Sequence, residues 1–327
     1  MKVAVVTVNY KTADMTLEAV SAAIGALGHI DDEWSITIVD NDSGDGSYEK
    51  MKNAVDQRRS DGLAGWESVF VLQSGNNGGF GAGNNFAIKK YLDSKNPPEY
   101  FYLLNSDAFP DSDAIQRLLD YMDENHKLGM AGSYIYGVDG KPHITAFRFP
   151  SIWGELEGGA CLGIITKLLK NYTVPIGIPD QPAQVDWVAG ASLMMRREML
   201  EKVGLFDETF FLYFEETDLC RQAALKGWKT HYVPASKVAH IGSASTKIKE
   251  SSDDAQEGRA NTVRLPSYWF ESRTHYFKKN HGKLYTIVAT VFRVLGCGIW
   301  FCKRLISKDR NHVPPHFVRD LIAHTKV

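Results

Sequence analysis

The chain has 327 residues, of which 44% are apolar, 11% aromatic and 23% charged. This composition is typical of a globular protein with a large core and excludes collagen-like, coiled-coil and disordered chains. The formal net charge of -2 argues against a protein that coats nucleic acid. The four cysteines form no C-x-x-C pair, and the N-terminus lacks the apolar region of a signal peptide, so we expect a cytoplasmic protein.

The first 130 residues alternate short β-rich runs with segments of helical periodicity, which predicts a mostly parallel sheet covered by helices. Expected strands cover residues 3–10, 35–41, 68–74 and 100–105, and expected helices cover 17–27 and 115–122, the second capped by Ser112. In such sheets the ligand binds beyond the carboxyl ends of the strands. We therefore expect Asn9, Asp40, Asn41 and Asp107 to converge on one crevice that holds a nucleotide.

A glycine-rich stretch over residues 75–85 lies between an expected strand and an expected helix, where backbone amides could face phosphate. It differs from a dinucleotide fingerprint, because Asn84 stands where the third glycine is required and the stretch follows the third strand. A classical Rossmann site is therefore disfavoured. A flexible surface loop is the alternative interpretation.

Four acids and a histidine carry candidate chemistry. Asp107 follows an apolar strand, which suits a ligand of a divalent cation, although a turn before Pro110 would also explain it. Glu215, Glu216 and Asp218 begin an expected helix, where acids also stabilise the helix dipole. Adjacent residues leave a helix in different directions, so Glu215 and Glu216 cannot share one role. His240 ends a β-like stretch, and a lone histidine there is more often structural.

The last part of the chain is basic: residues 264–310 hold ten Lys or Arg and two acids. This segment contains an apolar run over residues 284–302, interrupted by Arg293, Gly296 and Gly298. A central arginine costs roughly 2.5–3.5 kcal/mol on membrane-insertion scales, so we expect a packed or interfacial helix, with Trp300 and Phe301 at the interface. The segment would contact an anionic membrane surface or a second subunit of a homodimer.

Eight motifs follow one another along residues 3–282: Val8-Asn9-Tyr10, Asp40-Asn41, Asn77-x-Gly79-Phe80 with Asn85, Leu104-Asn105-Ser106-Asp107, Asp186-Trp187-Val188-x-Gly190, Gly204-x-Phe206-Asp207-Glu208, Phe214-Glu215-Glu216-x-Asp218-Leu219 and His240. In this order they resemble the family 2 inverting glycosyltransferases, in particular bacterial rhamnosyltransferase-like members. The resemblance implies an α/β protein of GT-A fold, with a Rossmann-like, mostly parallel sheet flanked by helices and a C-terminal helical extension. It also implies a nucleotide-sugar donor and Mg²⁺ or Mn²⁺ as cofactor.

The resemblance also assigns roles to individual residues. It places the nucleotide-sugar at Asn9, Asp40, Asn41, Asn77, Phe80, Asn85 and Asn105. It places the donor sugar and the acceptor at Trp187, Gly190 and Glu215, the metal at Asp107 and His240, and the catalytic base at Glu216. Two positions depart from the family pattern, since Asn105 replaces a frequent Asp and Glu216 replaces the usual Asp.

The resulting prediction is a two-part chain: residues 1–263 form the catalytic domain, and residues 264–327 form a basic, partly apolar helical segment. The chain would move a sugar, with rhamnose as the first candidate, from a dTDP- or UDP-sugar to a glycan or lipid-linked acceptor at the inner face of the cell membrane. A sugar nucleotidyltransferase and a non-catalytic carbohydrate-binding protein are the alternatives.

Overall fold

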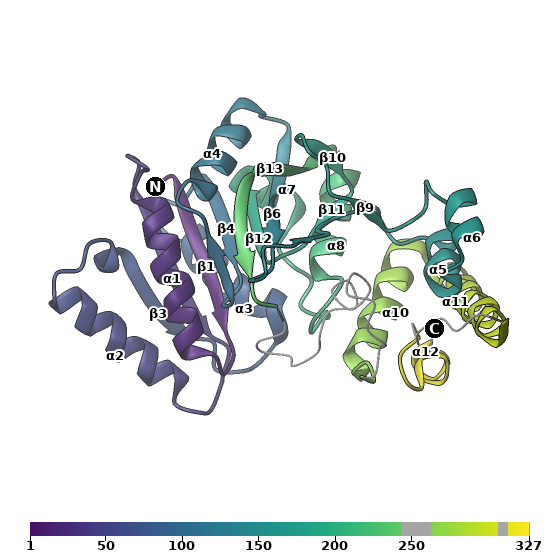
Figure 1. The fold of residues 1–327 in the computed structure, drawn as a ribbon. Coiled ribbons are helices and arrows are strands. Elements are labelled where there is room, and N and C mark those ends of the chain that lie inside the picture. Colours follow the sequence, from purple (N-terminus) through teal and green to yellow (C-terminus); the bar gives the residue numbers. More distant parts are fainter. Residues whose placement is uncertain (243–262, 307–312, 327) are drawn as a thin grey trace.

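The computed structural model describes residues 1–242, 263–306 and 313–326. A large mixed sheet with helices on both faces occupies most of the molecule, and a group of helices lies at one end of it (Figure 1). The GT-A expectation of an α/β protein with a C-terminal helical extension is confirmed at this level.

The main sheet has the strand order β10-β13-β6-β12-β4-β1-β2-β3, and β5 and β7 pair at its side. Its strands are β1 (Val3–Asn9), β2 (Trp34–Asp40), β3 (Val69–Gln73), β4 (Tyr100–Leu104), β5 (Ala108–Pro110), β6 (Leu128–Tyr136), β7 (Pro142–His143), β10 (Ala183–Val185), β12 (Ser192–Arg196) and β13 (Lys229–His240). The four predicted strands are confirmed as β1 to β4, and they pair in parallel. The sheet becomes mixed because β12 inserts antiparallel between β4 and β6.

Both faces of the sheet are buried, because β1 alternates its side chains between two apolar clusters. Val3 and Val5 face one cluster, and Ala4 and Val6 face the other. The first face is covered by α1 (Ala13–Leu27), α2 (Ser47–Ser60) and α4 (Ala114–Glu124), and the second by α3 (Gly79–Leu92), α7 (Arg197–Val203) and α8 (Glu215–Leu225). A short 3₁₀ turn, η1 (Trp66–Ser68), precedes β3.

The two predicted helices over residues 17–27 and 115–122 are confirmed as parts of α1 and α4. The expected cap of the second is wrong by one residue. Asp113, not Ser112, occupies the N-cap position of α4, and its side chain makes no capping hydrogen bond. The carboxylate of Asp113 instead accepts a hydrogen bond from Arg117 one turn later.

A second, three-stranded sheet of β11 (Trp187–Val188), β8 (Ala146–Phe147) and β9 (Pro175–Gly177) lies beside the main one. Beyond it, α5 (Ile152–Ala160), α6 (Gly163–Leu168), α10 (Ser267–His281), α11 (Lys283–Ile306) and α12 (Phe317–His324) form the helical module (Figure 1). The module therefore joins the C-terminal segment to residues from the middle of the chain, which the two-part prediction placed with the catalytic domain.

Glycines bring α5 and α11 into close contact. A methyl group on Gly296 would collide with the carbonyl oxygen of Leu156, and one on Gly159 would come within 2.7 Å of the carbonyl oxygen of Arg293. Arg273 of α10 joins both helices, since it lies 2.8 Å from Glu155 of α5 and donates from Nη1 to Thr290 Oγ1 of α11 at 3.2 Å. The predicted packed helix is confirmed along this face of α11.

Another face of α11 is apolar and exposed. Trp300 does not belong to it, since its side chain is 2% exposed within the module's own core, so its expected placement at an interface is wrong, whereas Phe301 is 47% exposed. By length and composition the helix is apolar enough to cross a membrane. Contact of this segment with a membrane surface or a second subunit stays a prediction.

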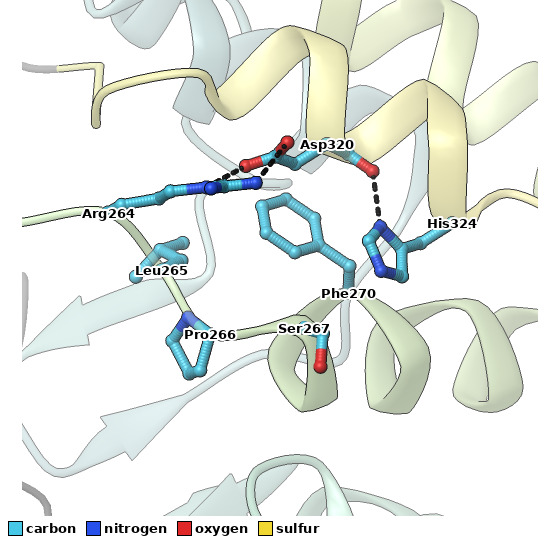
Figure 2. A pocket seen from close by; sticks show the side chains of 7 residues that line it. All are labelled: Arg264, Leu265, Pro266, Ser267, Phe270, Asp320 and His324. Atoms are coloured by element: carbon cyan, nitrogen blue, oxygen red, sulfur yellow. Dashed lines mark hydrogen bonds and ion pairs between the residues drawn. The ribbon is translucent and has the colours of Figure 1, made fainter.

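The helix α12 is fixed to the start of α10 by a two-point ion pair (Figure 2). Arg264 donates from Nε and Nη2 to the two carboxylate oxygens of Asp320, at 2.7 and 2.9 Å. His324 donates from Nδ1 to the backbone oxygen of Asp320 at 2.8 Å and stacks against Phe270. These groups line a pocket of about 350 Å³ in the helical module, and their charges are paired with one another.

Candidate active site

Polar side chains gather where β1 and β2 end, as predicted. The register places Asn9 directly beside Asp40. Asn9 donates from Nδ2 to Asp40 Oδ1 at 2.8 Å, and Ser43 donates to the same oxygen from its hydroxyl at 2.6 Å. All three residues are buried. The Asp40 carboxylate is thus held in one orientation at the strand end, and its contact with the base or ribose stays a prediction.

The glycine-rich stretch is an ordered helix start and not a flexible loop. Asn41 donates from Nδ2 to Asn77 Oδ1 and to the backbone oxygen of Gly79, both at 3.0 Å. Gly79 has a φ of 87°, and any Cβ there would collide with the carbonyl oxygen of Phe211. Phe80 donates its backbone N–H to that same oxygen at 3.1 Å. The first turn of α3 is therefore fixed against the segment that precedes α8.

Asn85 makes its side-chain hydrogen bonds to other residues of the protein. Its Nδ2 donates to the backbone oxygen of Phe206 and to Glu208 Oε1, both at 2.9 Å, and its Oδ1 accepts from the Phe206 N–H. The side chain is 1% exposed. Asn85 thus ties α3 to residues 206–208, and its expected contact with the nucleotide stays a prediction.

Asp107 and His240, distant in sequence, meet beyond the end of β4. His240 pairs opposite Ala108 in the sheet, and Ile241 N–H donates to the Asp107 backbone oxygen at 3.0 Å. These contacts bring His240 Nε2 to 3.1 Å from Asp107 Oδ1 and to 3.4 Å from Asn105 Nδ2. Both the Asp107 and His240 side chains are nine-tenths buried. The predicted metal ligands are therefore neighbours.

This pair fits a divalent cation that is shared with a substrate. Across residues 1–242, 263–306 and 313–326 no group of three or more His, Cys, Asp or Glu side chains could enclose a metal ion. A carboxylate and an imidazole are both ligands of Mn²⁺, and Mg²⁺ is commonly held by one or two carboxylates while phosphate oxygens and water complete its shell. A cation at this pair would take its remaining ligands from water or from a bound phosphate, and metal binding by Asp107 and His240 stays a prediction.

Phe80, Gly190 and Glu216, to which the sequence analysis gave different roles, lie close together at the start of α8. A Cβ on Gly190 would lie 3.2 Å from the Phe80 ring and 3.7 Å from Glu216 Oε1. The next residue, Ala191, accepts a hydrogen bond from the backbone N–H of Asn105 at 3.0 Å. The segment through Gly190 therefore connects the candidate base to the strand end that carries Asp107. The missing side chain at Gly190 allows the Phe80 ring to pack closely against this segment.

Glu215 differs from its neighbour in burial. It is 2% exposed and its Cβ lies beneath Gly81 of α3, whereas Glu216 is half-buried. Glu215 Oε2 has no hydrogen-bond partner among the described residues. Burial, and after it the negative charge of Glu216, hold the pKa of Glu215 well above the ordinary value. Burial therefore disfavours the ionised form of Glu215, and its part in acceptor binding stays a prediction.

Asp218 is occupied by a partner that sequence reasoning missed. Lys279 of α10 lies 2.6 Å from Asp218 and 2.8 Å from Asp207, which also pairs with His275 at 2.9 Å. Asn280 donates to the other oxygen of Asp218 at 2.8 Å. These bonds attach the helical module to the helix that carries Glu216. Only the basic character of the C-terminal segment signalled such partners in the sequence.

Trp187 belongs to the small sheet. Its ring stacks on Phe147 at a centroid distance of 4.1 Å, and its Nε1 donates to the backbone oxygen of Arg148 at 2.9 Å. The side chain is half-buried and held in place. Its expected contact with the donor sugar stays a prediction.

Comparison with known proteins establishes the family of this chain and, with it, the class of enzyme. The chain matches the family model "Glycosyl transferase family 2" over residues 3–204, which is more than half its length. It therefore belongs to this family and is a glycosyltransferase. A TM-score of 0.55 with S. aureus TarS 1-349 covers 94% of this chain and 92% of that one at 14% identity, and supports the GT-A fold. A mannosyltransferase from Pyrobaculum calidifontis, in complex with GDP-Man and Mn²⁺, gives 0.53 at 13% identity over 99% of this chain and 85% of that one.

Among curated proteins the chain is similar to rhamnosyltransferases. It is 29% identical over 241 residues to the N-acetylglucosaminyl-diphospho-decaprenol L-rhamnosyltransferase of Mycobacterium tuberculosis, covering 71% of this chain and 74% of that protein. It is 29% identical over 167 residues to the rhamnosyltransferase WbbL of Escherichia coli, covering 50% and 60% respectively. The predicted rhamnosyltransferase-like family is thereby confirmed.

Proposed function

We propose that this glycosyltransferase is an inverting enzyme of cell-envelope polysaccharide synthesis. It moves a sugar, with rhamnose as the first candidate, from a dTDP- or UDP-sugar to a glycan or lipid-linked acceptor. The names of its relatives support the sugar and the acceptor class, since one acts on a diphospho-decaprenol substrate and another, from Shigella flexneri, is a dTDP-rhamnosyl transferase 26% identical over 192 residues.

The proposal rests on the position of Glu216 beside Gly190. The residue after Gly190, Ala191, accepts a hydrogen bond from the backbone N–H of Asn105. A transferase needs a base on the acceptor side and charge neutralisation on the leaving-group side. Glu216 offers the base, and Asp107 with His240 offers the site for charge neutralisation. Residues 190 and 191 connect Glu216 to the strand end that carries Asp107. The proposed base and the proposed metal ligands would thus be connected through one segment of the chain.

Glu216 is the proposed catalytic base. The acceptor hydroxyl must lose its proton as its oxygen attacks the anomeric carbon, and a carboxylate within about 2.6–3.2 Å can accept that proton. The start of α8 favours an ionised carboxylate through the helix dipole. Burial beneath α3 disfavours the ionised form of Glu215, and Asp218 is paired with Lys279, so Glu216 is the acid of this first turn that is proposed to accept the proton. Attack from the face opposite the leaving group needs no covalent sugar intermediate and inverts the anomeric centre.

The leaving diphosphate would be bound at the strand ends. Asp107 and His240 would hold Mg²⁺ or Mn²⁺, which, when bound, neutralises the charge on the departing nucleoside diphosphate. Asn9, Asp40 and Asn41 would lie beneath the nucleoside, because their hydrogen bonds fix the carboxyl ends of β1 and β2, where the ligand of such a sheet binds. Family membership favours this reaction over a sugar nucleotidyltransferase or a non-catalytic carbohydrate-binding protein.

The test is the identity of the released product. The full chain is incubated with dTDP-rhamnose or UDP-sugars, with and without Mn²⁺, and with a polyprenyl-diphosphate-linked acceptor. A glycosyltransferase releases nucleoside diphosphate and adds one sugar to the acceptor, whereas a nucleotidyltransferase releases or consumes pyrophosphate. Nuclear magnetic resonance of the product reports the anomeric configuration. Pyrophosphate formation, or a product with the configuration retained, would overturn the proposal.

A further inference from the structure

Four buried hydroxyl groups form one hydrogen-bonded chain across four neighbouring strands. The strands β4, β12, β6 and β13 lie side by side in the main sheet (Figure 1), and each contributes one residue. The hydroxyl of Tyr102 lies 2.7 Å from that of Ser192, which lies 2.6 Å from that of Ser133. The Ser133 hydroxyl in turn lies 2.7 Å from that of Ser236. All four residues are buried, and the reaction proposed above uses none of them.

This hydroxyl chain lies within an apolar layer. Tyr102 belongs to the same apolar cluster as Val233 and Val238, which lie on either side of Ser236 in β13. A buried hydroxyl costs stability unless it is hydrogen-bonded, and a break in the chain would leave at least one group unpaired. Small apolar side chains at these positions would fill the layer without that constraint. The hydroxyl chain therefore specifies one relative arrangement of the four strands.

The hydroxyl chain ends at a bulge in β13. Val233 is opposite Ser133 of β6, whereas Lys237 is opposite the next residue of β6, so residues 234–236 have no counterpart there. The first of these three is a proline, which lacks the N–H that regular pairing requires and is tolerated at bulges. The last is Ser236, which is fully buried and bonded to Ser133. Its hydroxyl thus attaches the bulge to the neighbouring strand.

The bulge separates two different neighbours of β13. Residues 230–232 pair with β10, and residues 238–240 pair with β5. Because β5 begins immediately after Asp107, the second pairing brings His240 Nε2 to 3.1 Å from Asp107 Oδ1. A shift of one residue at the bulge would turn His240 toward the other face of the sheet. The distance between the two proposed metal ligands therefore depends on the bulge.

Both ends of the hydroxyl chain lead to this pair. Tyr102 lies in β4, five residues before Asp107, and Ser236 lies in β13, four residues before His240. The strands β12 and β6 separate β4 from β13 in the sheet. The hydroxyl chain thus connects, through side chains, the two strands that lead to the two residues.

We propose that Ser236 is a positioning residue for the metal site. Through the hydroxyl chain it holds the bulge of β13 in the register that keeps His240 beside Asp107. The inference rests on the proposed function, in which this pair holds Mg²⁺ or Mn²⁺. Ser236 acts through its strand and is not itself a ligand, so its effect on the pair is present before any metal or donor is bound.

The experiment compares Ser236→Ala with Ser35→Ala in the full chain. Ser35 is the matched control, because its hydroxyl is also buried in the main sheet and lies 2.7 Å from a tyrosine hydroxyl, that of Tyr91, but at the start of β2. The first measurement is hydrogen exchange in the metal-free protein, by NMR, at the Ile241 amide that donates to the Asp107 backbone oxygen. This exchange should be about tenfold faster in Ser236→Ala and unchanged in Ser35→Ala.

The second measurement is calorimetric titration with Mn²⁺ in the presence of dTDP or UDP. The affinity for Mn²⁺ should fall by about tenfold in Ser236→Ala, a usual loss when a residue that orients metal ligands is removed, while nucleotide binding without metal stays unchanged. Tyr102→Phe removes only the hydroxyl at the other end of the chain and should change both measurements in the same direction. This variant decides the question if Ser236→Ala does not fold. Tyr91→Phe is its control.

Weaker Mn²⁺ binding and faster exchange at Ile241 in Ser236→Ala or Tyr102→Phe, and in neither control, support the proposal. Unchanged Mn²⁺ affinity in the folded variants overturns it. An equal loss in the controls also overturns it, since that loss would come from lower stability in general.

A further variant separates this inference from the proposed function. If Mn²⁺ binding survives Asp107→Asn, the proposed metal site is wrong and the positioning role falls with it. Faster exchange at Ile241 in Ser236→Ala would then show that the failure lies in metal binding and not in the hydroxyl chain.

Discussion

The strand-end crevice and the helical module are both assembled from distant parts of the sequence, but different forces hold them together. In the crevice, buried polar side chains bond to one another, as Asn9 does to Asp40 and Asp107 to His240. In the module, helices approach through glycines such as Gly296, and ion pairs close the ends. The strand-end cluster holds side chains that are proposed to bind the donor and the metal, whereas the ion pairs of the module join helices.

The two regions meet at α10. Lys279 pairs with Asp207 and Asp218, and Ser272 donates to the backbone oxygen of Leu212 at 3.0 Å. These contacts all fall on residues 207–218, the segment that leads into α8 and Glu216. The module therefore supports the part of the crevice that carries the proposed base.

The largest effect is expected from Glu216→Gln, which keeps the shape of the side chain and removes its basicity. Turnover with saturating donor and a competent acceptor should fall by about 10²–10⁴-fold, the usual contribution of a general base, while the donor Kd stays unchanged. Glu215→Gln should cost much less, because that carboxyl is buried and its pKa is raised, so its ionised form is disfavoured. If Glu215→Gln abolishes turnover and Glu216→Gln does not, the two roles are reversed.

Asp107→Asn tests the leaving-group side of the crevice. The loss of one carboxylate ligand should weaken Mn²⁺-dependent binding of nucleoside diphosphate by roughly tenfold or more, since even partners of metal ligands contribute that much. Calorimetry with and without Mn²⁺ measures this, and Asp113→Asn, at the exposed start of α4, is the control. Unchanged affinity and unchanged Mn²⁺ dependence in Asp107→Asn would exclude Asp107 as the ligand.

Lys279→Met cuts the link between the two regions. The buried Asp218 carboxylate would lose its ion-pair partner, so the free energy of unfolding should fall by about 1–3 kcal/mol in urea titrations. Turnover should fall by a few-fold at unchanged donor affinity, and Lys279→Arg should restore most of it. Lys278→Met, at an exposed position next to it, controls for loss of charge. If Lys279→Met behaves like Lys278→Met in both measurements, α10 does not support the base.

The comparison also shows what the sequence could predict. The strands β1 to β4 follow from short β-rich runs because both faces of a parallel sheet are buried. The insertion of β12 between β4 and β6 could not be predicted in this way, because pairing between distant segments leaves no local signal. Motif order assigned Phe80, Gly190 and Glu216 to the candidate site; the structure places them close together, and their roles stay predictions.

Glycines were the main source of error. The sequence predicts a flexible loop or a phosphate-binding turn over residues 75–85, but α3 begins at Gly79. A Cβ on Gly81 would touch Phe206, and one on Gly83 would come within 2.9 Å of Val8. Close packing therefore overrides the low helix propensity of glycine, and the same holds for Gly296 in α11. Local propensity cannot reveal such contacts, because the partner lies elsewhere in the sequence.

The smallest effect is expected from the pH dependence of stability in Glu215→Gln. Burial and the charge of Glu216 raise the pKa of Glu215 well above the ordinary 4.5. Between these two values the folded state keeps a proton that the unfolded state releases, so this group lowers stability as the pH rises. Glu215→Gln removes that loss, and its melting temperature should exceed that of the unaltered chain by about 2 °C or more near pH 8, with the difference shrinking toward pH 5.

Glu208→Gln provides a control of opposite sign, because Lys89 and Asn85 lower the pKa of Glu208. The stability that this carboxylate contributes is present at high pH and lost as the pH falls. A destabilisation by Glu215→Gln that is equal at every pH would mean that the pKa of Glu215 is not raised in the folded protein, and burial would then no longer distinguish Glu215 from Glu216 as a base.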